Sequence, residues 1–221
     1  MLKNIIYVLT LKKIPEVSWS SSYEYNLKPK KLTIFYLIIG LILFGLGETL
    51  LVTANIGVSP WFVLHQGLSF KTGYSIGITT FIISITVLLL WFPLKQKPGI
   101  ATILNAILIS VVIDLSLPFL PQPEDFLLQL LQVVFGILII GIGSGFYLVA
   151  NLGPGPRDGL MTGINKQTSL SFSLIRTIIE LSAVGLGFYL GGIVGIGTIL
   201  YAVGIGFSVS LGLFLVGKFF K

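Results

Sequence analysis

The side chains best placed to do chemistry are a few charged and polar residues that interrupt long apolar runs. Glu48 stands in the segment GLGET, whose glycines let a neighbouring backbone approach closely. A carboxylate inside hydrocarbon is costly and therefore rare. Its presence indicates one of two roles, which the sequence favours equally: a proton- or ion-coupling group, or a structural carboxylate held by hydrogen bonds near the outer interface.

Arg157 and Asp158 follow the segment GPGP and open a short predicted helix. The N-terminus of a helix presents free N–H groups and the positive end of the helix dipole, so it attracts anions. An arginine there strengthens the attraction, which predicts an anion site. The alternative, which the residue types favour somewhat more, is that Arg157 anchors the topology and Asp158 is an acid stabilised by the dipole.

Three further polar residues have plainer explanations. Arg176 and Glu180 are spaced i, i+4, so they share a helix face and can form a salt bridge, which we favour over a second anion contact. His65 is better explained as a hydrogen-bonded packing residue than as a proton relay. With the asparagines at two predicted helix breaks added, the candidate solute-binding residues are Arg157, Arg176, Glu48, Asn55, Asn151, Asp158, Glu180 and His65.

Composition determines what must surround these residues. The chain has 221 residues, of which 54% are hydrophobic and 10% charged. A soluble domain carries about 25% charged residues, so this chain must turn apolar surface toward lipid. It has no cysteine and one histidine, which excludes disulfides and metal sites built from thiolates or histidine clusters. No hydrolase, kinase, redox or nucleotide-binding motif is present, and we predict no cofactor, no metal and no enzymatic activity.

The net charge of +6 is carried largely by lysines just outside the apolar runs. Such clusters are topology signals and contacts to anionic lipid, and they do not indicate nucleic-acid binding. We interpret residues 1–31 as a polar, basic cytoplasmic leader, with residues 5–11 and Trp19 lying along the membrane surface. The leader does not resemble a cleaved signal peptide. Residues 32–218 are predicted to form a single transmembrane domain.

Six apolar runs are long enough to cross about 30 Å of hydrocarbon, and two segments between them are too short. The long runs are 32–53, 74–93, 99–119, 126–150, 172–190 and 193–217, and the short segments are 60–70 and 156–166. Each short segment follows a closely similar sequence, ANIGVSP at 54–60 and ANLGPGP at 150–156. Asn and Gly there end one helix and Pro begins the next.

These two sequences belong to a repeat with a constant offset of 96 residues, since 150 − 54 = 96. The repeated units cover about residues 35–112 and 131–208. Identical glycine, threonine, asparagine and proline at one offset are not explained by apolar composition and indicate duplication. Examples are Gly40/Gly136, Gly45/Gly141, Gly47/Gly143, Asn55/Asn151, Pro60/Pro156, Thr72/Thr168, Ser75/Ser171 and Thr102/Thr198.

Charge in the loops predicts the orientation. If both termini are cytoplasmic and each short segment returns to the side it left, the lysines near residues 95–97 lie inside, while the acidic loop at 124–125 lies outside. Each repeat then crosses the membrane three times, so the second copy is inverted. The predicted fold is all-α and integral to the membrane, with six transmembrane helices and two short re-entrant or broken helices in two inverted repeats.

Several of these segments resemble the YczE/YyaS/YitT family of bacterial membrane proteins, most closely its YczE-like branch. The resemblance rests on GVSPW at 57–61, KPGI at 97–100, GPGPRDGLM at 153–161 and GIGT at 195–198. It covers about residues 40–206, and the leader before Lys31 is expected to be particular to this protein. The resemblance implies a multi-pass protein of the bacterial cytoplasmic (inner) membrane and names no substrate.

The function that the pattern favours is a small secondary transporter or permease for a small solute, with an anion as the leading class. Inverted repeats with broken helices are typical of such transporters, although a fold alone does not determine function. The alternative is a non-transporting accessory protein that supports the assembly or regulation of other membrane proteins. The predicted partners are the lipid bilayer and a small anionic solute, and self-association of the chain is left open.

Overall fold

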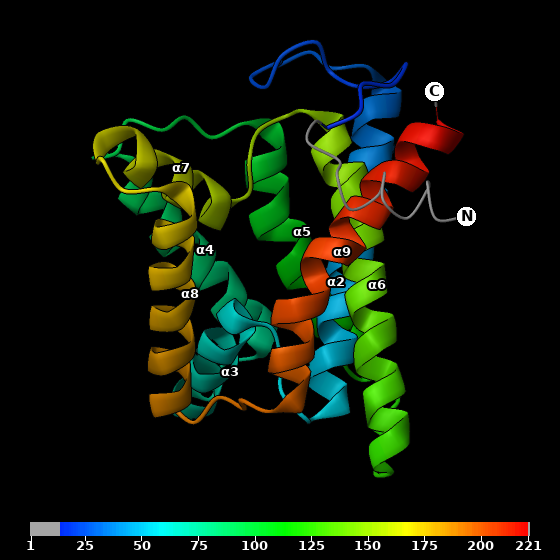
Figure 1. Ribbon diagram of the computed structural model, residues 1–221, viewed down its shortest axis with the longest axis vertical. Helices are drawn as coiled ribbons and strands as arrows, with labels where there is room; N and C mark the ends of the chain where they lie inside the picture. Colours follow the sequence, from blue (N-terminus) through cyan, green and yellow to red (C-terminus); the bar gives the residue numbers. More distant parts are fainter. Residues whose placement is uncertain (1–13, 221) are drawn as a thin grey trace.

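A computed structural model describes residues 14–220, and this part of the chain consists of eight helices and contains no strand (Figure 1). The predicted all-α class is confirmed. The helices are α2 (Lys31–Ala54), α3 (Pro60–Thr72), α4 (Ile76–Trp91), α5 (Ile100–Ser116), α6 (Phe126–Ala150), α7 (Pro156–Gln167), α8 (Phe172–Tyr189) and α9 (Ile196–Phe219).

Four of these helices, α2, α6, α8 and α9, are long and apolar enough to cross a membrane. A fifth candidate span is the pair α3 and α4, which is bent by 116° at its break, and α5 is a shorter apolar helix. Because α4 has 16 residues and α5 has 17, each is about 25 Å long, less than the ~30 Å of the hydrocarbon layer. The structure thus has four to five candidate spans where the sequence predicted six.

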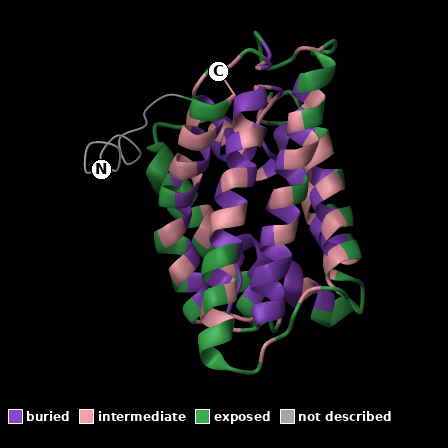
Figure 2. Cartoon of the chain, turned by 90° about the vertical axis from the view of Figure 1, so that its right-hand side faces the viewer, coloured by how far each residue is buried: buried purple, intermediate pink, exposed green. Residues whose placement is uncertain are grey.

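Large apolar side chains face outward along these helices. Phe135 on α6 and Val203 on α9 are 58% and 80% exposed, and Figure 2 shows the exposed and half-buried residues on the outside of the bundle with the buried ones inside. A soluble monomer rarely exposes large contiguous apolar patches. These faces therefore contact the lipid bilayer, as expected for a membrane protein.

Both helix breaks have the same local structure. Asn55 and Asn151 cap α2 and α6 in the left-handed conformation, with φ of 57° and 52°. Gly57 and Gly153 follow with φ of 112° and 108°, a region that side chains rarely adopt. Proline then occupies the first position of α3 and of α7, where its missing N–H costs no hydrogen bond.

Helices α2 and α6 pack side by side and run in opposite directions (Figure 1). Glycines make this close approach possible: a Cβ atom at Gly40 would lie 2.7 Å from the carbonyl oxygen of Gly143, and one at Gly47 would lie 2.7 Å from that of Gly136. Such distances exclude any side chain at these two glycines. The α2–α6 pair is therefore fixed at its two glycine crossings, and the other helices pack around it.

Two hydrogen bonds tie the broken segments to distant helices. The Ala101 N–H donates to the Leu152 carbonyl at 2.9 Å, and the Gly197 N–H donates to the Ile56 carbonyl at 2.8 Å. Each residue of one bond is 96 positions from a residue of the other. The segment after α2 is thereby joined to the start of α9, and the segment after α6 to the start of α5.

Residues 14–30 lie over the end of the bundle where α2 begins. The Ser21 N–H donates to the Ala150 carbonyl, and the Asn151 amide donates to the Ser21 carbonyl at 2.9 Å. Trp19 is 1% exposed, with its ring centroid 4.7 Å from that of Tyr36. The prediction that Trp19 lies along the membrane surface is wrong, because the protein interior buries it; residues 5–11 lie outside the described part of the chain.

Candidate functional site

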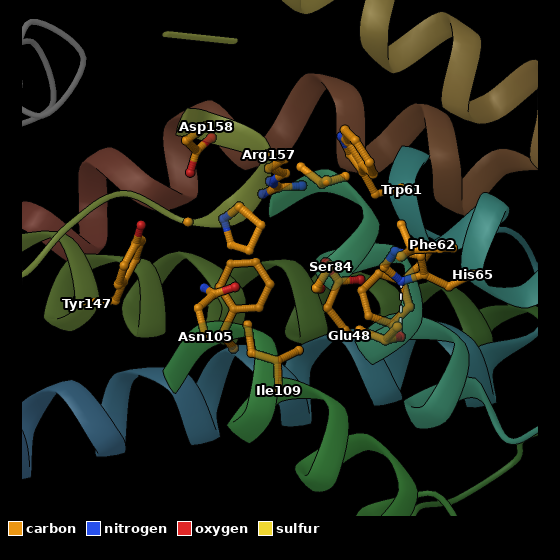
Figure 3. Close-up of a pocket in the computed structure, with 16 residues that line it drawn as sticks. Glu48, Trp61, Phe62, His65, Ser84, Asn105, Ile109, Tyr147, Arg157 and Asp158 are labelled. Atoms are coloured by element: carbon orange, nitrogen blue, oxygen red, sulfur yellow. Dashed lines mark hydrogen bonds between the residues drawn. The ribbon is translucent and has the colours of Figure 1, made fainter. Parts of the chain in front are cut away.

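A cavity of about 70 Å³ lies between α2, α3, α4, α5, α6 and the first turn of α7 (Figure 3). This volume counts the space open to the centre of a water-sized sphere, of which one water needs roughly 10–15 Å³. The cavity therefore has room for several waters or a small polyatomic ion. Aromatic side chains form much of the wall: Phe44, Trp61, Phe62 and Tyr147. Its polar side chains are Glu48, His65, Thr80, Ser84, Asn105, Tyr147, Arg157 and Asp158.

Glu48 reaches this cavity from the C-terminal half of α2 and is fully buried. Both of its carboxylate oxygens lie within hydrogen-bonding distance of the Ser59 hydroxyl, at 2.9 and 3.1 Å. Ser59 is the residue before α3 and is itself buried. The break between α2 and α3 thus turns the chain back so that Ser59 lies beside Glu48.

Arg157 reaches the cavity from the first turn of α7. Its guanidinium carbon lies 5.9 Å from the centroid of the Phe44 ring, within cation–π range, and Tyr201 of α9 lies beside the group. Among residues 14–220 the one ion pair within 4.0 Å is Arg176–Glu180. Within that stretch, neither Glu48 nor Asp158 neutralises Arg157 at contact distance.

Three polar groups converge around Gly155 at one end of the cavity. A Cβ atom at Gly155 would lie 3.3 Å from the Tyr147 hydroxyl, 3.4 Å from the Asp158 carboxylate and 3.6 Å from the Asn105 amide nitrogen. Tyr147 is 5% exposed, and its hydroxyl forms no well-aligned hydrogen bond within residues 14–220. A buried hydroxyl without a partner is costly, so this end of the cavity is suited to a polar ligand or water.

His65 lines the cavity from α3. Its Nδ1 lies 3.0 Å from the Thr80 hydroxyl, and its ring packs on that of Phe62 with centroids 4.7 Å apart. It is 6% exposed. These contacts give His65 both a hydrogen-bond partner and a packing role.

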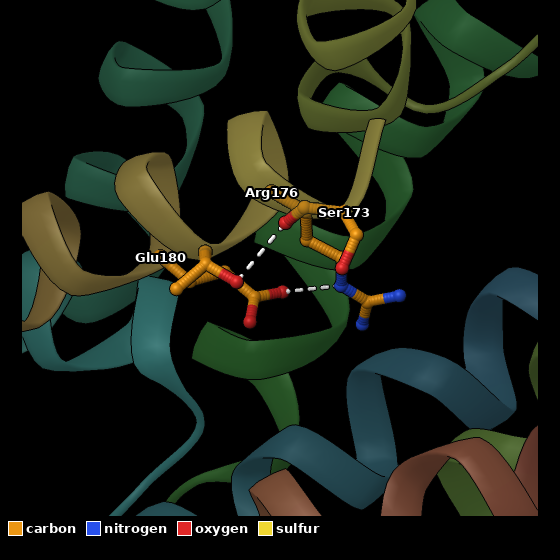
Figure 4. A network of polar contacts seen from close by, with 4 residues as sticks. Ser173, Arg176 and Glu180 are labelled. Carbon is orange, nitrogen blue, oxygen red and sulfur yellow. Dashed lines mark hydrogen bonds and ion pairs between the residues drawn. The ribbon is translucent and has the colours of Figure 1, made fainter. Parts of the chain in front are cut away.

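The structure brings four of the candidate residues together in this cavity: Glu48, His65, Arg157 and Asp158. The other four lie elsewhere. Asn55 and Asn151 end α2 and α6 as helix caps. Arg176 and Glu180 pair on α8, with Nε and Oε1 3.0 Å apart and side-chain exposures of 52% and 30% (Figure 4).

Sequence reasoning did not single out Ser59, Asn105 or Tyr147 as part of a site. Asn105 interrupts the apolar run of α5, so its polarity was an available signal. Ser59 and Tyr147 carried none, because a serine before a proline is an ordinary helix start and tyrosine is common in membrane helices. Only the packing of the helices places Tyr147 in the cavity wall and the Ser59 hydroxyl against Glu48.

The comparisons with known proteins give the family. Residues 31–212 match the model of a family described as "Family of unknown function (DUF6198)". The chain belongs to this family. It is 33% identical over 168 residues to the "Uncharacterized membrane protein YczE" of Bacillus subtilis strain 168, covering 74% of this chain and 77% of that protein. It is 31% identical over 167 residues to "Uncharacterized protein YyaS" of the same strain, covering 73% and 83%.

These matches confirm the resemblance to YczE and YyaS. An "Uncharacterized protein" of Haemophilus influenzae strain KW20 / Rd is 38% identical over 205 residues, 93% of each chain. That match is longer than the stretch from Lys31 to Lys221, so part of the leader is shared. The expectation that the leader is particular to this protein is therefore wrong. No solved structure matches the chain significantly.

Proposed function

We propose that this chain is a small secondary transporter, and that the solute it moves across a bacterial cytoplasmic membrane is a small anion. The observation that carries the proposal is the position of Arg157. Its guanidinium faces a cavity inside a membrane protein, from the first turn of a helix whose N–H groups lack partners within the helix. The planar guanidinium fork matches carboxylate and phosphate oxygens. The proposal is for binding and translocation, not catalysis.

The proposed architecture is two inverted repeats with six crossings, which counts α4 and α5 as spans. Three pairs of helices support it, because α3 and α7, α4 and α8, and α5 and α9 each begin 96 residues apart. The two exchanged hydrogen bonds of the broken segments obey the same offset. The antiparallel α2 and α6, and the position of α3 and α7 near opposite ends of the molecule in Figure 1, are what a two-fold axis in the membrane plane would produce.

The proposed orientation has both termini in the cytoplasm. The start of α2, the loop at residues 92–99 and the end of α9 lie at one end of the molecule in Figure 1. These regions carry lysines, among them Lys31, Lys95, Lys97 and Lys218. The loop before α6, with Glu124 and Asp125, lies at the other end. The excess of basic residues at one end supports a cytoplasmic position for it.

Substitution of Arg157 tests the function. Wild type, Arg157→Gln and Arg157→Lys are purified, and thermal stabilisation is measured with sulfate, nitrate, inorganic phosphate and lactate. Each hydrogen bond to a charged group contributes about 1.5–3 kcal/mol. Arg157→Gln should therefore lower the affinity for the anion that stabilises the wild type most by at least tenfold. Arg157→Lys keeps the charge but loses the fork, and should give an intermediate affinity.

Arg176→Gln is the matched control, because it removes an arginine of the same membrane domain that lies outside the cavity. It should bind anions as wild type does. Equal stabilisation of wild type and Arg157→Gln would remove Arg157 from the site. Uptake of the best anion into liposomes that contain only this protein separates a transporter from an accessory protein, which should co-purify with a partner and transport nothing alone.

A further inference from the structure

The cavity presents an unfavourable charge balance for an anion. Its wall carries one cation, Arg157, and two carboxylates, Glu48 and Asp158. With all three ionised the wall has a formal charge of −1. An anion that entered would add at least one further negative charge in a place with little water to screen it. Binding therefore becomes favourable if one carboxylate takes up a proton.

Glu48 is the carboxylate suited to that role. It is fully buried, whereas Asp158 is partly exposed in the first turn of α7. The Ser59 hydroxyl suits either state of Glu48, because it donates to a carboxylate and can accept from a protonated carboxyl. No rearrangement of the wall is then needed when Glu48 gains or loses a proton.

The other groups that face this part of the cavity do not replace Glu48. On α3, His65 is engaged with Thr80, and α4 and α5 contribute only uncharged polar groups to the wall. Tyr147 of α6, which lines the cavity, and Tyr201 of α9, which lies beside Arg157, are neutral phenols at physiological pH. Arg157 lies within electrostatic reach of Glu48 while forming no ion pair with it at contact distance.

We propose that binding of an anion at Arg157 is accompanied by protonation of Glu48, so that one proton and one anion enter the cavity together. This inference rests on the proposed function. In the empty site the positive charge of Arg157 stabilises the Glu48 carboxylate, and in the occupied site it stabilises the bound anion instead. When the solute binds, one proton from water moves onto a Glu48 oxygen. When the solute leaves, Glu48 releases that proton to the water on the same side. A transporter built in this way carries both in the same direction.

Sulfate is a dianion throughout the physiological pH range, so the pH dependence of its affinity for the wild type tests the proposal. If one proton is taken up per anion, affinity should fall as pH rises, by up to about tenfold per pH unit. Glu48→Gln carries a permanently neutral group of the same shape. It should bind sulfate with one affinity at all pH values, close to that of the wild type at low pH. Glu180→Gln, which removes a carboxylate outside the cavity, should keep the wild-type slope.

Calorimetry on the wild type gives a measurement that needs no variant. Titration of sulfate in two buffers with different ionisation enthalpies reports the number of protons taken up per sulfate bound. The proposal expects a number clearly above zero, and at most one, near neutral pH. Zero protons, or the same pH slope in Glu48→Gln as in the wild type, overturns the proton linkage and leaves the anion site standing. No binding of sulfate, nitrate or lactate at any pH overturns both the linkage and the proposed function.

Discussion

Substitution of Gly155 by alanine should change anion binding without damaging the folded protein. The φ and ψ of Gly155 are −64° and 161°, which any residue adopts, so alanine there introduces no backbone strain. The added methyl would enter the cavity beside the Tyr147 hydroxyl at 3.3 Å, the Asp158 carboxylate at 3.4 Å and the Asn105 amide at 3.6 Å. These contacts are tight but not prohibitive, since a shift of a few tenths of an ångström relieves the shortest.

Gly155→Ala should raise the stability of the protein and lower its affinity for an anion. Replacing glycine where the native angles suit alanine stabilises a protein by about 0.4–1 kcal/mol through the unfolded chain. For a chain of this length that corresponds to an increase in melting temperature of roughly 1–4 °C. The methyl also displaces ligand or water from the polar groups it covers. Loss of one hydrogen bond to a charged group is worth about 1.5–3 kcal/mol, so Gly155→Ala should bind the best anion at least tenfold more weakly.

Gly153→Ala is the matched control, two residues earlier in the same loop. Gly153 has a φ of 108°, and its added methyl would lie 2.8 Å from the Cα atom of Gly99. The backbone of a distant helix cannot yield as a side chain does, so this variant should unfold at a clearly lower temperature. The assay is thermal unfolding of each protein in detergent with and without sulfate. A Gly155→Ala protein that binds sulfate as wild type does would show that the groups around Gly155 are not part of the site.

Two further predictions concern the architecture. Single cysteines placed at Lys71 and Lys166, on a background without any cysteine, should react with impermeant reagents from opposite sides of the membrane; labelling of both from one side would contradict the inverted repeat. Gly141→Ala places a methyl 2.3 Å from the backbone of Ser208 and should destabilise the protein by about 1–3 kcal/mol. Gly206→Ala, whose methyl meets nothing within 4 Å, should be neutral or stabilising. Equal melting temperatures of the two variants would refute the close packing of α6 on α9.

The sequence predicted the helices well because membrane helices leave strong signals. The run at 126–150 coincides with α6, and the breaks after Ala54 and Ala150 fall where the structure ends α2 and α6. These features depend on local chemistry: apolar length, an asparagine or glycine that adopts a left-handed angle, and a proline that starts a helix. The lengths of α4 and α5 were less predictable, since turns at their ends are as apolar as the helices themselves.

The contents of the cavity could be predicted only in part, because they depend on which helices meet. Glu48, His65, Arg157 and Asp158 drew attention because charge and imidazole are rare in apolar runs. Asn55 and Asn151 were predicted to end helices and were also candidate site residues; the structure uses them as helix caps, outside the cavity. Sequence spacing favoured a salt bridge between Arg176 and Glu180, and the structure has that ion pair.

The repeat separates the residues that build the fold from those that line the cavity. Pairs identical at the 96-residue offset, such as Gly57 and Gly153, form the breaks and close crossings that both halves need. The polar lining residues all differ from their counterparts: Glu48/Ser144, His65/Met161, Thr80/Arg176, Ser84/Glu180, Asn105/Tyr201, Tyr147/Leu51, Arg157/Trp61 and Asp158/Phe62. In particular, Arg157 and Trp61 occupy equivalent positions and both line the cavity, one as a cation and the other as an aromatic wall. Under the proposed duplication, the residues that the two halves share form the helical frame, and the residues that differ give the cavity its asymmetric, charged wall.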